Sequence, residues 1–273
     1  MRRLIVNADD FGFTPAVTAG ILEAHAAGSV SSTSMMVRCA GWEDGVRNAR
    51  ATPALGVGLH LNLIAGTPLA RVPSLTDSRS GRYFSLATIV RKALLGRIDR
   101  DEVVAECHAQ LAALRDAGIR VTHVDSHRHT HALPVIRRAV ASVAAGLGLP
   151  LRRPVESPWA ISGGVAAHLR RGAIGMSWRA TSIGAPRTRA ADHFIGLSMQ
   201  GSARFAERFA AAVTALAAGT TEIMVHPGRV DDALRSADGY TWQRERELAA
   251  LVSPALRERL RRGDLTLIGF GAL

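Results

Sequence analysis

The hydrophobic positions of this chain alternate between short apolar runs and longer segments with helical spacing. Residues 3–9 form an apolar run that ends in polar side chains, which is typical of a buried strand that delivers Asp9 and Asp10 at its carboxyl end. Thr14 and Pro15 have the properties of a helix N-cap and of the residue that follows it. A strand followed by a helix is therefore predicted for the first 28 residues.

The same alternation continues to the end of the chain. Further strands are predicted at 31–37, 55–63, from 121 onward, and at 149–153, 194–197, 221–226 and 265–270. Further helices are predicted at 42–51, 100–117, 133–147, 205–218, 242–252 and 254–262. Roughly seven or eight strand–helix units indicate a parallel α/β sheet or a closed, irregular barrel.

Two segments interrupt this alternation. Residues 65–99 are rich in Pro, Gly and Ser and are helical in pattern only between 86 and 95. Residues 154–189 are irregular, with a Gly pair and scattered Arg. Long segments of this kind in a parallel fold are often loops over the active site. We expect both to cover the functional end of one domain that spans residues 1–273.

Composition restricts the environment of the protein. The chain has 273 residues, 47% of them hydrophobic, which is enough for a large core. Cys39 and Cys107 are its two cysteines, too few for a disulfide framework or a cysteine-based zinc site. The apolar run at the N-terminus is too short for a signal peptide, and no other run is long enough to span a bilayer. These features predict a cytoplasmic protein.

The net charge of +11 invites a search for an anionic partner. Lys92 is the single lysine among 34 basic residues, so the arginine excess indicates compositional bias. No stretch interleaves aromatic residues with arginine as single-strand binders do. We therefore expect no nucleic-acid partner, whereas attraction of anionic substrates or peripheral contact with an anionic membrane stays open, above all for residues 152–189.

The chemistry of the chain is concentrated in residues 122–131, which hold four of its ten histidines and Asp125. If the strand that begins at Val121 continued through this segment, His123, Asp125, His127, His129 and His131 would share one face. Imidazole and carboxylate groups are the usual ligands of divalent metals such as zinc. The segment therefore predicts a metal site, with more histidines than one ion needs.

Other polar clusters fall where a parallel fold would place its active site, at the carboxyl ends of predicted strands. These clusters are Asp9 with Asp10, then His60, then residues 125–131, and finally His226. Since such strand ends meet at one edge of the sheet, the four clusters are expected to form one site.

Four segments, 4–12, 56–62, 123–131 and 222–228, resemble the motifs of the YdjC-like carbohydrate deacetylase family. Segments 240–247 and 267–270 fit the same family, so the resemblance covers nearly the whole chain. The resemblance implies a distorted, TIM-barrel-like (β/α) barrel, often a homodimer. It also implies that one divalent metal assists removal of the N-acetyl group from an N-acetylglucosamine-type sugar, releasing acetate.

Carried over position by position, the resemblance makes Asp10, His60 and His127 the metal ligands. It makes Asp9 the general base and His226 a candidate general acid. Two imidazoles favour Zn²⁺, whereas the resemblance favours Mg²⁺.

The remaining polar residues of the histidine-rich segment have less certain roles. Asp125 is expected to orient a metal ligand. His129 and His131 are interpreted as substrate contacts, replacement ligands or the acid, and Arg128 is expected to face away.

Two other functions stay open at this point. A phosphoesterase with a single metal could use the same Asp-His-His set, and a non-catalytic sugar- or metal-binding protein could keep the ligands alone. The second is disfavoured because binding needs neither a base at Asp9 nor an acid at His226. Oligosaccharides and glycolipids would present the same acetamide group, so the substrate class stays open as well.

Overall fold

The computed structural model describes residues 1–157 and 165–273, and within them the strands form one parallel sheet. The spatial order is β4-β3-β2-β1-β6-β5, and β7 pairs with the first part of β1. The strands are β1 (Arg2–Phe11), β2 (Ser32–Met35), β3 (Gly56–Leu61), β4 (Val121–Ser126), β5 (His193–Ile195), β6 (Gly219–Val225) and β7 (Thr266–Leu267). β1 is therefore a central strand, with β2 and β7 on one side and β6 on the other.

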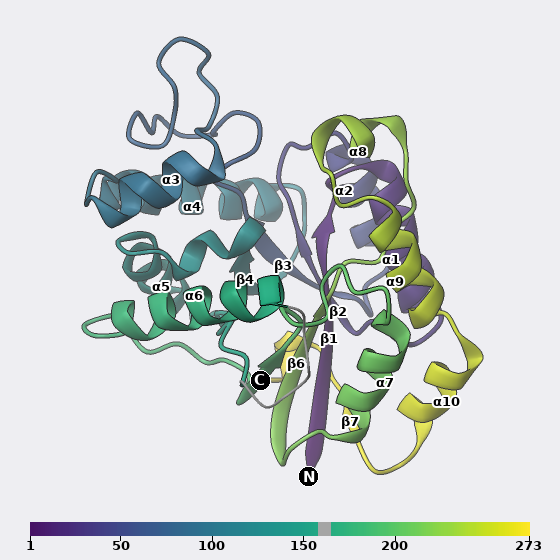
Figure 1. Cartoon of the computed structure of the whole chain (residues 1–273). Coiled ribbons are helices and arrows are strands. Elements are labelled where there is room, and N and C mark those ends of the chain that lie inside the picture. The colour runs from purple at the N-terminus through teal and green to yellow at the C-terminus, as the bar shows by residue number, and fades with distance from the viewer. Residues whose placement is uncertain (158–164) are drawn as a thin grey trace.

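Helices cover the outside of this sheet on both sides (Figure 1). Those on one side are α3 (Leu86–Leu94), α4 (Arg100–Asp116), α5 (Ile136–Gly146) and α6 (Val165–Thr181). Those on the other are α1 (Pro15–Ala26), α2 (Trp42–Ala51), α7 (Phe205–Thr214), α8 (Asp232–Ala237), α9 (Trp242–Leu251) and α10 (Pro254–Arg261). Two short 3-10 helices complete the fold, η1 (His127–Ala132) and η2 (Phe270–Ala272).

The sheet curls into a half-barrel, and a short segment lies between its two edge strands. Val124 of β4 forms an isolated parallel bridge with Leu151, and Glu156 forms one with Phe194 of β5. Residues 151–156 thus lie between β4 and β5 without forming a regular strand. The expected distorted barrel of the α/β class is confirmed, and the strand predicted at 149–153 is reduced to one bridge.

The interior of the half-barrel is filled by side chains of the strands and closed at one end by η2. Phe270 of η2 is fully buried and stacks on the ring of His123, with ring centroids 3.9 Å apart. Gly58 of β3 makes room for that ring, because a Cβ at this position would lie 2.3 Å from it. His123 is therefore a packed core residue, and burial lowers its pKa to about 3.

Local signals explain where several helices begin. The Thr14 side chain accepts a hydrogen bond from the backbone N–H of Val17 at 3.2 Å, and Pro15 opens α1, as the sequence predicts. Ser253 and Pro254 repeat this arrangement at the start of α10. The helix predicted at 42–51 has the observed bounds of α2.

Other predictions of local structure were wrong. β4 ends at Ser126 instead of running on through the histidines, and the last predicted strand is shortened to β7. The segment 154–189 contains the 17-residue helix α6, and residues 158–164 lie outside the described ranges. No helix in the described ranges is both long and apolar enough to cross a bilayer.

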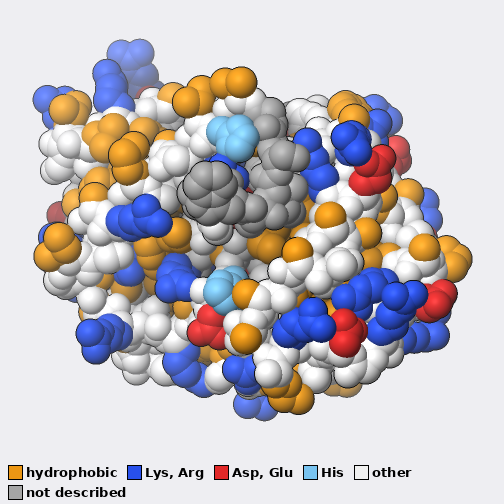
Figure 2. All heavy atoms as spheres, turned by 60° about the horizontal axis from the view of Figure 1, so that its bottom comes forward, with side chains coloured by type: hydrophobic (Ala, Val, Ile, Leu, Met, Phe, Trp, Pro, Cys, Tyr) orange, Lys and Arg blue, Asp and Glu red, His pale blue; other side chains and the backbone are white. Residues whose placement is uncertain are grey.

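Figure 2 shows one face of the molecule, where Lys and Arg side chains gather in several separate groups.

Candidate metal and catalytic site

The carboxyl ends of β1, β3, β4 and β6 meet around a cavity of about 470 Å³. Asp9, Asp10, His60, His127 and His226 all line it. The four polar clusters that the sequence places at strand ends are thus brought together, as expected for a parallel fold. The cavity is also lined by residues of α3 and α6, from the two segments predicted to cover this end.

A distortion at the end of β1 lets two neighbouring aspartates reach this cavity. Adjacent residues of a regular strand point to opposite faces. Asp10 has a φ of +72°, and the pairing of β1 with β2 changes register between Ala8 and Phe11. A left-handed residue in an irregular strand re-aims the side chains around it. Both carboxylates therefore face the same space, which the sequence pattern alone cannot decide.

A second distortion directs His127 toward Asp10. Arg128 and His129 both have a φ of +54°, so the chain leaves the strand direction after Ser126 and forms η1. The shared face predicted for His123 through His131 was wrong for this reason. His127 Nδ1 lies 3.0 Å from Asp10 Oδ1 as a result.

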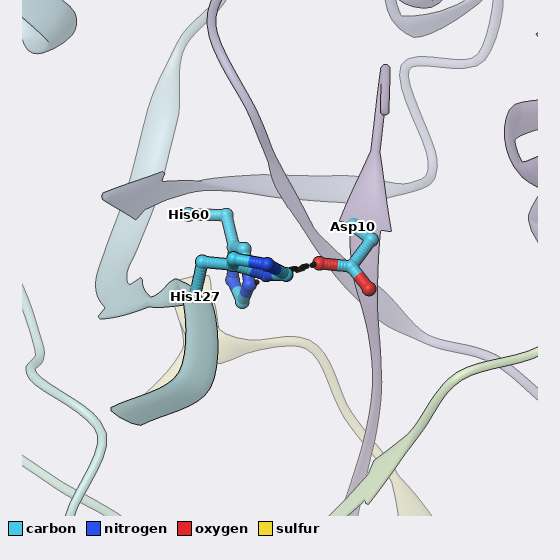
Figure 3. A group of neighbouring side chains, drawn as sticks. All are labelled: Asp10, His60 and His127. Carbon is cyan, nitrogen blue, oxygen red and sulfur yellow. Dashed lines mark hydrogen bonds and ion pairs between the residues drawn. The ribbon is translucent and has the colours of Figure 1, made fainter. Parts of the chain in front are cut away.

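Asp10, His60 and His127 form a compact group of potential ligands (Figure 3). One donor atom from each lies within 4.8 Å of the others, and all three residues are buried. His60 Nε2 is 3.1 Å from Asp10 Oδ1. Burial favours the protonated form of Asp10, but Arg244 and His127 hold its pKa well below the usual range. Asp10 is therefore an anion at neutral pH.

The surroundings of His60 fit a cation beside Nε2. Its Nδ1 donates to Asp125 Oδ1 at 2.7 Å, so Nε2, the atom that faces Asp10, is the one that can bind either a proton or a metal ion. Burial opposes protonation of His60, but Asp125 and Asp10 outweigh it and raise its pKa to about 10. The position thus attracts positive charge strongly, and two imidazoles with one carboxylate are a usual ligand set for a divalent metal. Ser34 Oγ donates to Asp125 Oδ2 at 2.8 Å and holds that carboxylate in place.

Asp9 is held by an arginine that the sequence did not indicate. Arg152 is fully buried, and its Nη1 and Nη2 donate to the two oxygens of Asp9 at 2.6 and 2.7 Å. The same guanidinium reaches Asp125 at 2.8 Å and Glu222 at 2.7 Å. Burial by itself would lower the pKa of Arg152, but the three carboxylates raise this pKa well above its usual value.

This ion pairing distinguishes two possible metal groups. Asp9, His60 and Asp125 also lie close enough to hold an ion. Arg152 already supplies the positive charge for both of these carboxylates. The group of Asp10, His60 and His127 is therefore the better candidate.

A second buried arginine supports Asp10. Arg244 Nη2 donates to Asp10 Oδ2 at 2.7 Å and lies 3.4 Å from Asp238 Oδ2. Asp10 Oδ1 therefore stays directed at the two histidines, while Oδ2 is fixed by Arg244. Such a contact sets the orientation of a potential ligand without itself binding the metal.

His226 directly follows β6, far from Asp9 in the sequence, but its ring lies close to Asp9 in space. Its Nε2 is 4.0 Å from Asp9 Oδ2, and its backbone N–H donates to Glu247 at 2.6 Å. Tyr240 packs against the ring, with centroids 5.5 Å apart. Burial lowers the pKa of His226 to about 4, although Asp9 opposes this effect. The imidazole is therefore neutral at pH 7.

The other residues of the histidine-rich segment separate into two kinds. His129 lines the cavity, whereas His131 is buried outside its lining and bonds Ser126 Oγ at 2.5 Å. Arg128 was expected to face away, which was wrong. It lines the cavity and forms an ion pair with Asp238 at 2.7 Å.

Sequence reasoning missed Ser34, Arg152, Arg244 and Glu247. Arg244 and Glu247 fall within the segment 240–247 that carries the family resemblance, so the motif could have indicated them. Arg152 lies on the predicted strand 149–153, where the strand-end rule could have included it.

Comparisons with known proteins agree with the family resemblance seen in the sequence. The model of the family described as YdjC-like protein matches residues 3–262. A carbohydrate deacetylase of Brevibacillus brevis is 34% identical, with 99% of each chain covered. A chitooligosaccharide deacetylase of Enterobacter sp. is 34% identical, with 93% of this chain and 92% of that protein covered.

Among solved structures, a candidate cellobiose-phosphate cleavage protein from Enterococcus faecalis V583 is similar. It superposes with a TM-score of 0.79 at 27% identity, covering 99% of this chain and 98% of the other. The resemblance seen in the sequence motifs thus extends over the whole fold. The chain belongs to the YdjC-like protein family.

Proposed function

We propose that this protein is a carbohydrate deacetylase that hydrolyses the acetamide of an N-acetylated amino sugar and releases acetate. The observation that carries the proposal is the placement of Asp9 and His226, 4.0 Å apart, beside the group of Asp10, His60 and His127. The names of the relatives, carbohydrate deacetylase and chitooligosaccharide deacetylase, support the same reaction.

In this proposal one divalent metal, Mg²⁺ or Zn²⁺, is held by Asp10, His60 and His127. When bound, it would polarise the acetyl carbonyl and lower the pKa of a water molecule. Asp125, with Ser34, orients His60 so that Nε2 points into the site. Arg244 fixes Asp10 from the opposite side.

Asp9 is the general base that accepts a proton from the attacking water. Arg152 binds both of its oxygens and Asn7 Nδ2 donates to Oδ1 at 2.9 Å, so the lone pair that is free to take that proton is on Oδ2, the oxygen that faces His226. As the oxygen of water bonds to the carbonyl carbon and the C–N bond breaks, the sugar nitrogen needs a proton. His226 Nε2 supplies it.

His226 is neutral in the free protein, which restricts the stage of the reaction at which it can act as the acid. A histidine whose pKa is about 4 is a neutral imidazole at pH 7 and lacks the acidic proton of the imidazolium. His226 therefore acts as an acid only after it has gained a proton during the reaction. Asp9 Oδ2, 4.0 Å from His226 Nε2, is the group that passes one on. The products are acetate and a free amino sugar, and the enzyme ends with its original protons.

His129 is the histidine of η1 that faces the cavity besides His127, so we propose it as a substrate contact. His131 is proposed to hold η1 in shape through Ser126. A cytoplasmic location and a homodimer stay predictions, which cell fractionation and sedimentation velocity test.

The test uses protein stripped of metal and then reloaded with Mg²⁺, with Zn²⁺ or with neither. Acetate release from a di-N-acetylated chitin disaccharide is measured for the wild type, for Asp9→Asn and for Asp101→Asn. We expect release only with metal, and a loss of about a hundredfold or more in kcat for Asp9→Asn with metal affinity retained. Asp101 is exposed on α4 and serves as the control.

Full activity of Asp9→Asn, or equal activity of stripped and reloaded protein, would contradict the proposed mechanism. Release of phosphate from phosphorylated sugars without any acetate release would instead favour a phosphoesterase.

A further inference from the structure

The cavity beside the candidate metal group has an apolar wall built from two helices. Leu86, Val90 and Leu94 of α3 recur every four residues, so they form one stripe along that helix, and all three line the cavity. Ala173 and Ile174 of α6 line it as well. An apolar wall of this kind does not match the polar surface of a hydrophilic sugar. It would suit an apolar group attached to the sugar.

The apolar surface continues from the wall onto the outside of the molecule. Leu94 and the next residue, Leu95, are 68% and 58% exposed. On α6, Leu169 and Met176 are each 70% exposed. They lie four residues before and three residues after Ala173, which makes them its neighbours on the helix surface. Large exposed apolar side chains thus lie next to cavity-lining residues on both helices, and such patches mark interaction sites.

Positive charge accompanies these apolar side chains. On α3, Arg91 is exposed and Lys92 is half-buried, both within four residues of the exposed leucines, and on α6 Arg170 and Arg179 are exposed. The sequence from 165 to 191 contains no Asp or Glu. α3 and α6 lie on the same side of the sheet in Figure 1. Helices that combine exposed apolar residues with Arg and Lys are typical of proteins that bind the surface of anionic membranes.

Resting on the proposed function, we propose that the mouth of the cavity between α3 and α6 docks on an anionic membrane surface. The substrate there is a glycolipid with an N-acetylated amino sugar as its head group. The sugar enters the cavity and places its acetamide beside Asp10, His60 and His127. The apolar part of the lipid lies along the stripe of Leu86, Val90 and Leu94, while Leu95, Leu169 and Met176 enter the bilayer surface.

A second copy of this chain fits the same surface less well. In a two-fold dimer the same patch meets itself, so residues of α3 and α6 would face their own copies or each other. Both helices carry exposed arginines next to the apolar residues, and like charges would then be brought together. At a negatively charged lipid surface the apolar side chains enter the bilayer while the arginines bind the anionic head groups.

The binding experiment uses the full-length protein and two kinds of vesicle. One is phosphatidylcholine alone, and the other contains about one quarter phosphatidylglycerol. The test variant carries Leu95→Gln, Leu169→Gln and Met176→Gln, three exposed residues outside the cavity lining. Leu147→Gln is the matched control, because Leu147 is 53% exposed at the end of α5 and does not line the cavity.

We expect the wild type and the control to sediment with the anionic vesicles. The test variant should bind them at least about tenfold more weakly, since each lost apolar contact reduces insertion. Failure of the wild type to bind anionic vesicles would overturn the proposal, and so would equal binding of all three proteins. A change from dimer to monomer in the test variant, with no lipid binding by the wild type, would assign the surface to a second copy instead.

Activity separates this inference from the proposed function. Acetate release is measured from a soluble chitin disaccharide and from an N-acetylglucosaminyl lipid in the anionic vesicles. The test variant should keep its rate on the disaccharide and lose about tenfold or more on the vesicle-bound lipid. Equal losses on both substrates would overturn the docking role. No acetate from either substrate would refute the proposed function, while the vesicle binding would still decide whether the surface docks on lipid.

Discussion

The two sides of the cavity are built on different physical principles. On the strand side, Asp9, Asp10, Asp125, Arg152 and Arg244 are all buried, and each is held by an ion pair of 3 Å or less. On the helix side, α3 and α6 present apolar residues that are half-buried or exposed to solvent. The strand side therefore depends on exact partners, whereas the helix side depends on shape and area. Substitutions on the two sides should have very different costs.

The largest effect is expected for Arg152→Met. This change leaves Asp9, Asp125 and Glu222 buried around an apolar side chain, and removal of one partner from a buried ion pair costs about 3–5 kcal/mol of unfolding free energy. The comparison variant is Arg128→Met, which breaks an ion pair whose arginine is half exposed and should cost about 1 kcal/mol or less. Urea unfolding of both variants measures the difference. Similar midpoints for the two would mean that the buried network contributes no more than a surface pair.

A smaller effect, dependent on pH, is expected from His123 beneath the site. Burial lowers its pKa to about 3, below that of the unfolded chain, so the folded protein binds fewer protons between these two values. The stability that comes from neutral His123 is thus complete above a pH of about 6.5 and is lost as the pH falls toward 3. His123→Phe keeps a ring beside Phe270 and removes the titration. The slope of unfolding free energy against pH should fall by about 1.4 kcal/mol per pH unit in this range. An unchanged slope would show that His123 is solvated.

The smallest effect is expected on the helix side. Leu94→Ala removes a side chain that is 68% exposed, so the unfolding free energy should change by about 0.5 kcal/mol or less. Ile89 is fully buried on the same helix, and Ile89→Ala should cost about 2–5 kcal/mol. Thermal or urea unfolding of the pair tests this contrast within a single helix. A large loss for Leu94→Ala would show that the apolar wall is part of the core.

Much of the fold could be predicted from residues close together in the chain. The alternation of apolar runs and helical spacing indicated most of the strands and helices, and the caps at Thr14 and Ser253 mark helix starts. The rule that active sites lie at the carboxyl ends of parallel strands brought the four polar clusters to one place. The predicted strands, helices and caps depend on periodicity or on contacts within about one helical turn, and the strand-end rule needs only the order of these elements.

The errors fell where the backbone departs from its regular period. The strand that was expected to run through His131 ends at Ser126, because Arg128 and His129 adopt left-handed conformations. Asp10 does the same at the end of β1. Non-glycine residues rarely adopt positive φ and do so when the surrounding structure holds them there. No spacing rule for helices or strands could therefore have indicated these turns.

By itself the sequence determined the class of fold, the edge of the sheet that carries the site, and the residue types gathered there. Only the tertiary structure decided which of these residues meet, and with what charge. Asp9 binds Arg152, 143 positions away, and Asp10 binds Arg244, 234 positions away. The physical reason is the separation in sequence between the residues that interact. Strand and helix patterns arise from neighbouring residues, whereas the orientation of a buried carboxylate and its protonation depend on whichever charges the fold brings within a few ångströms.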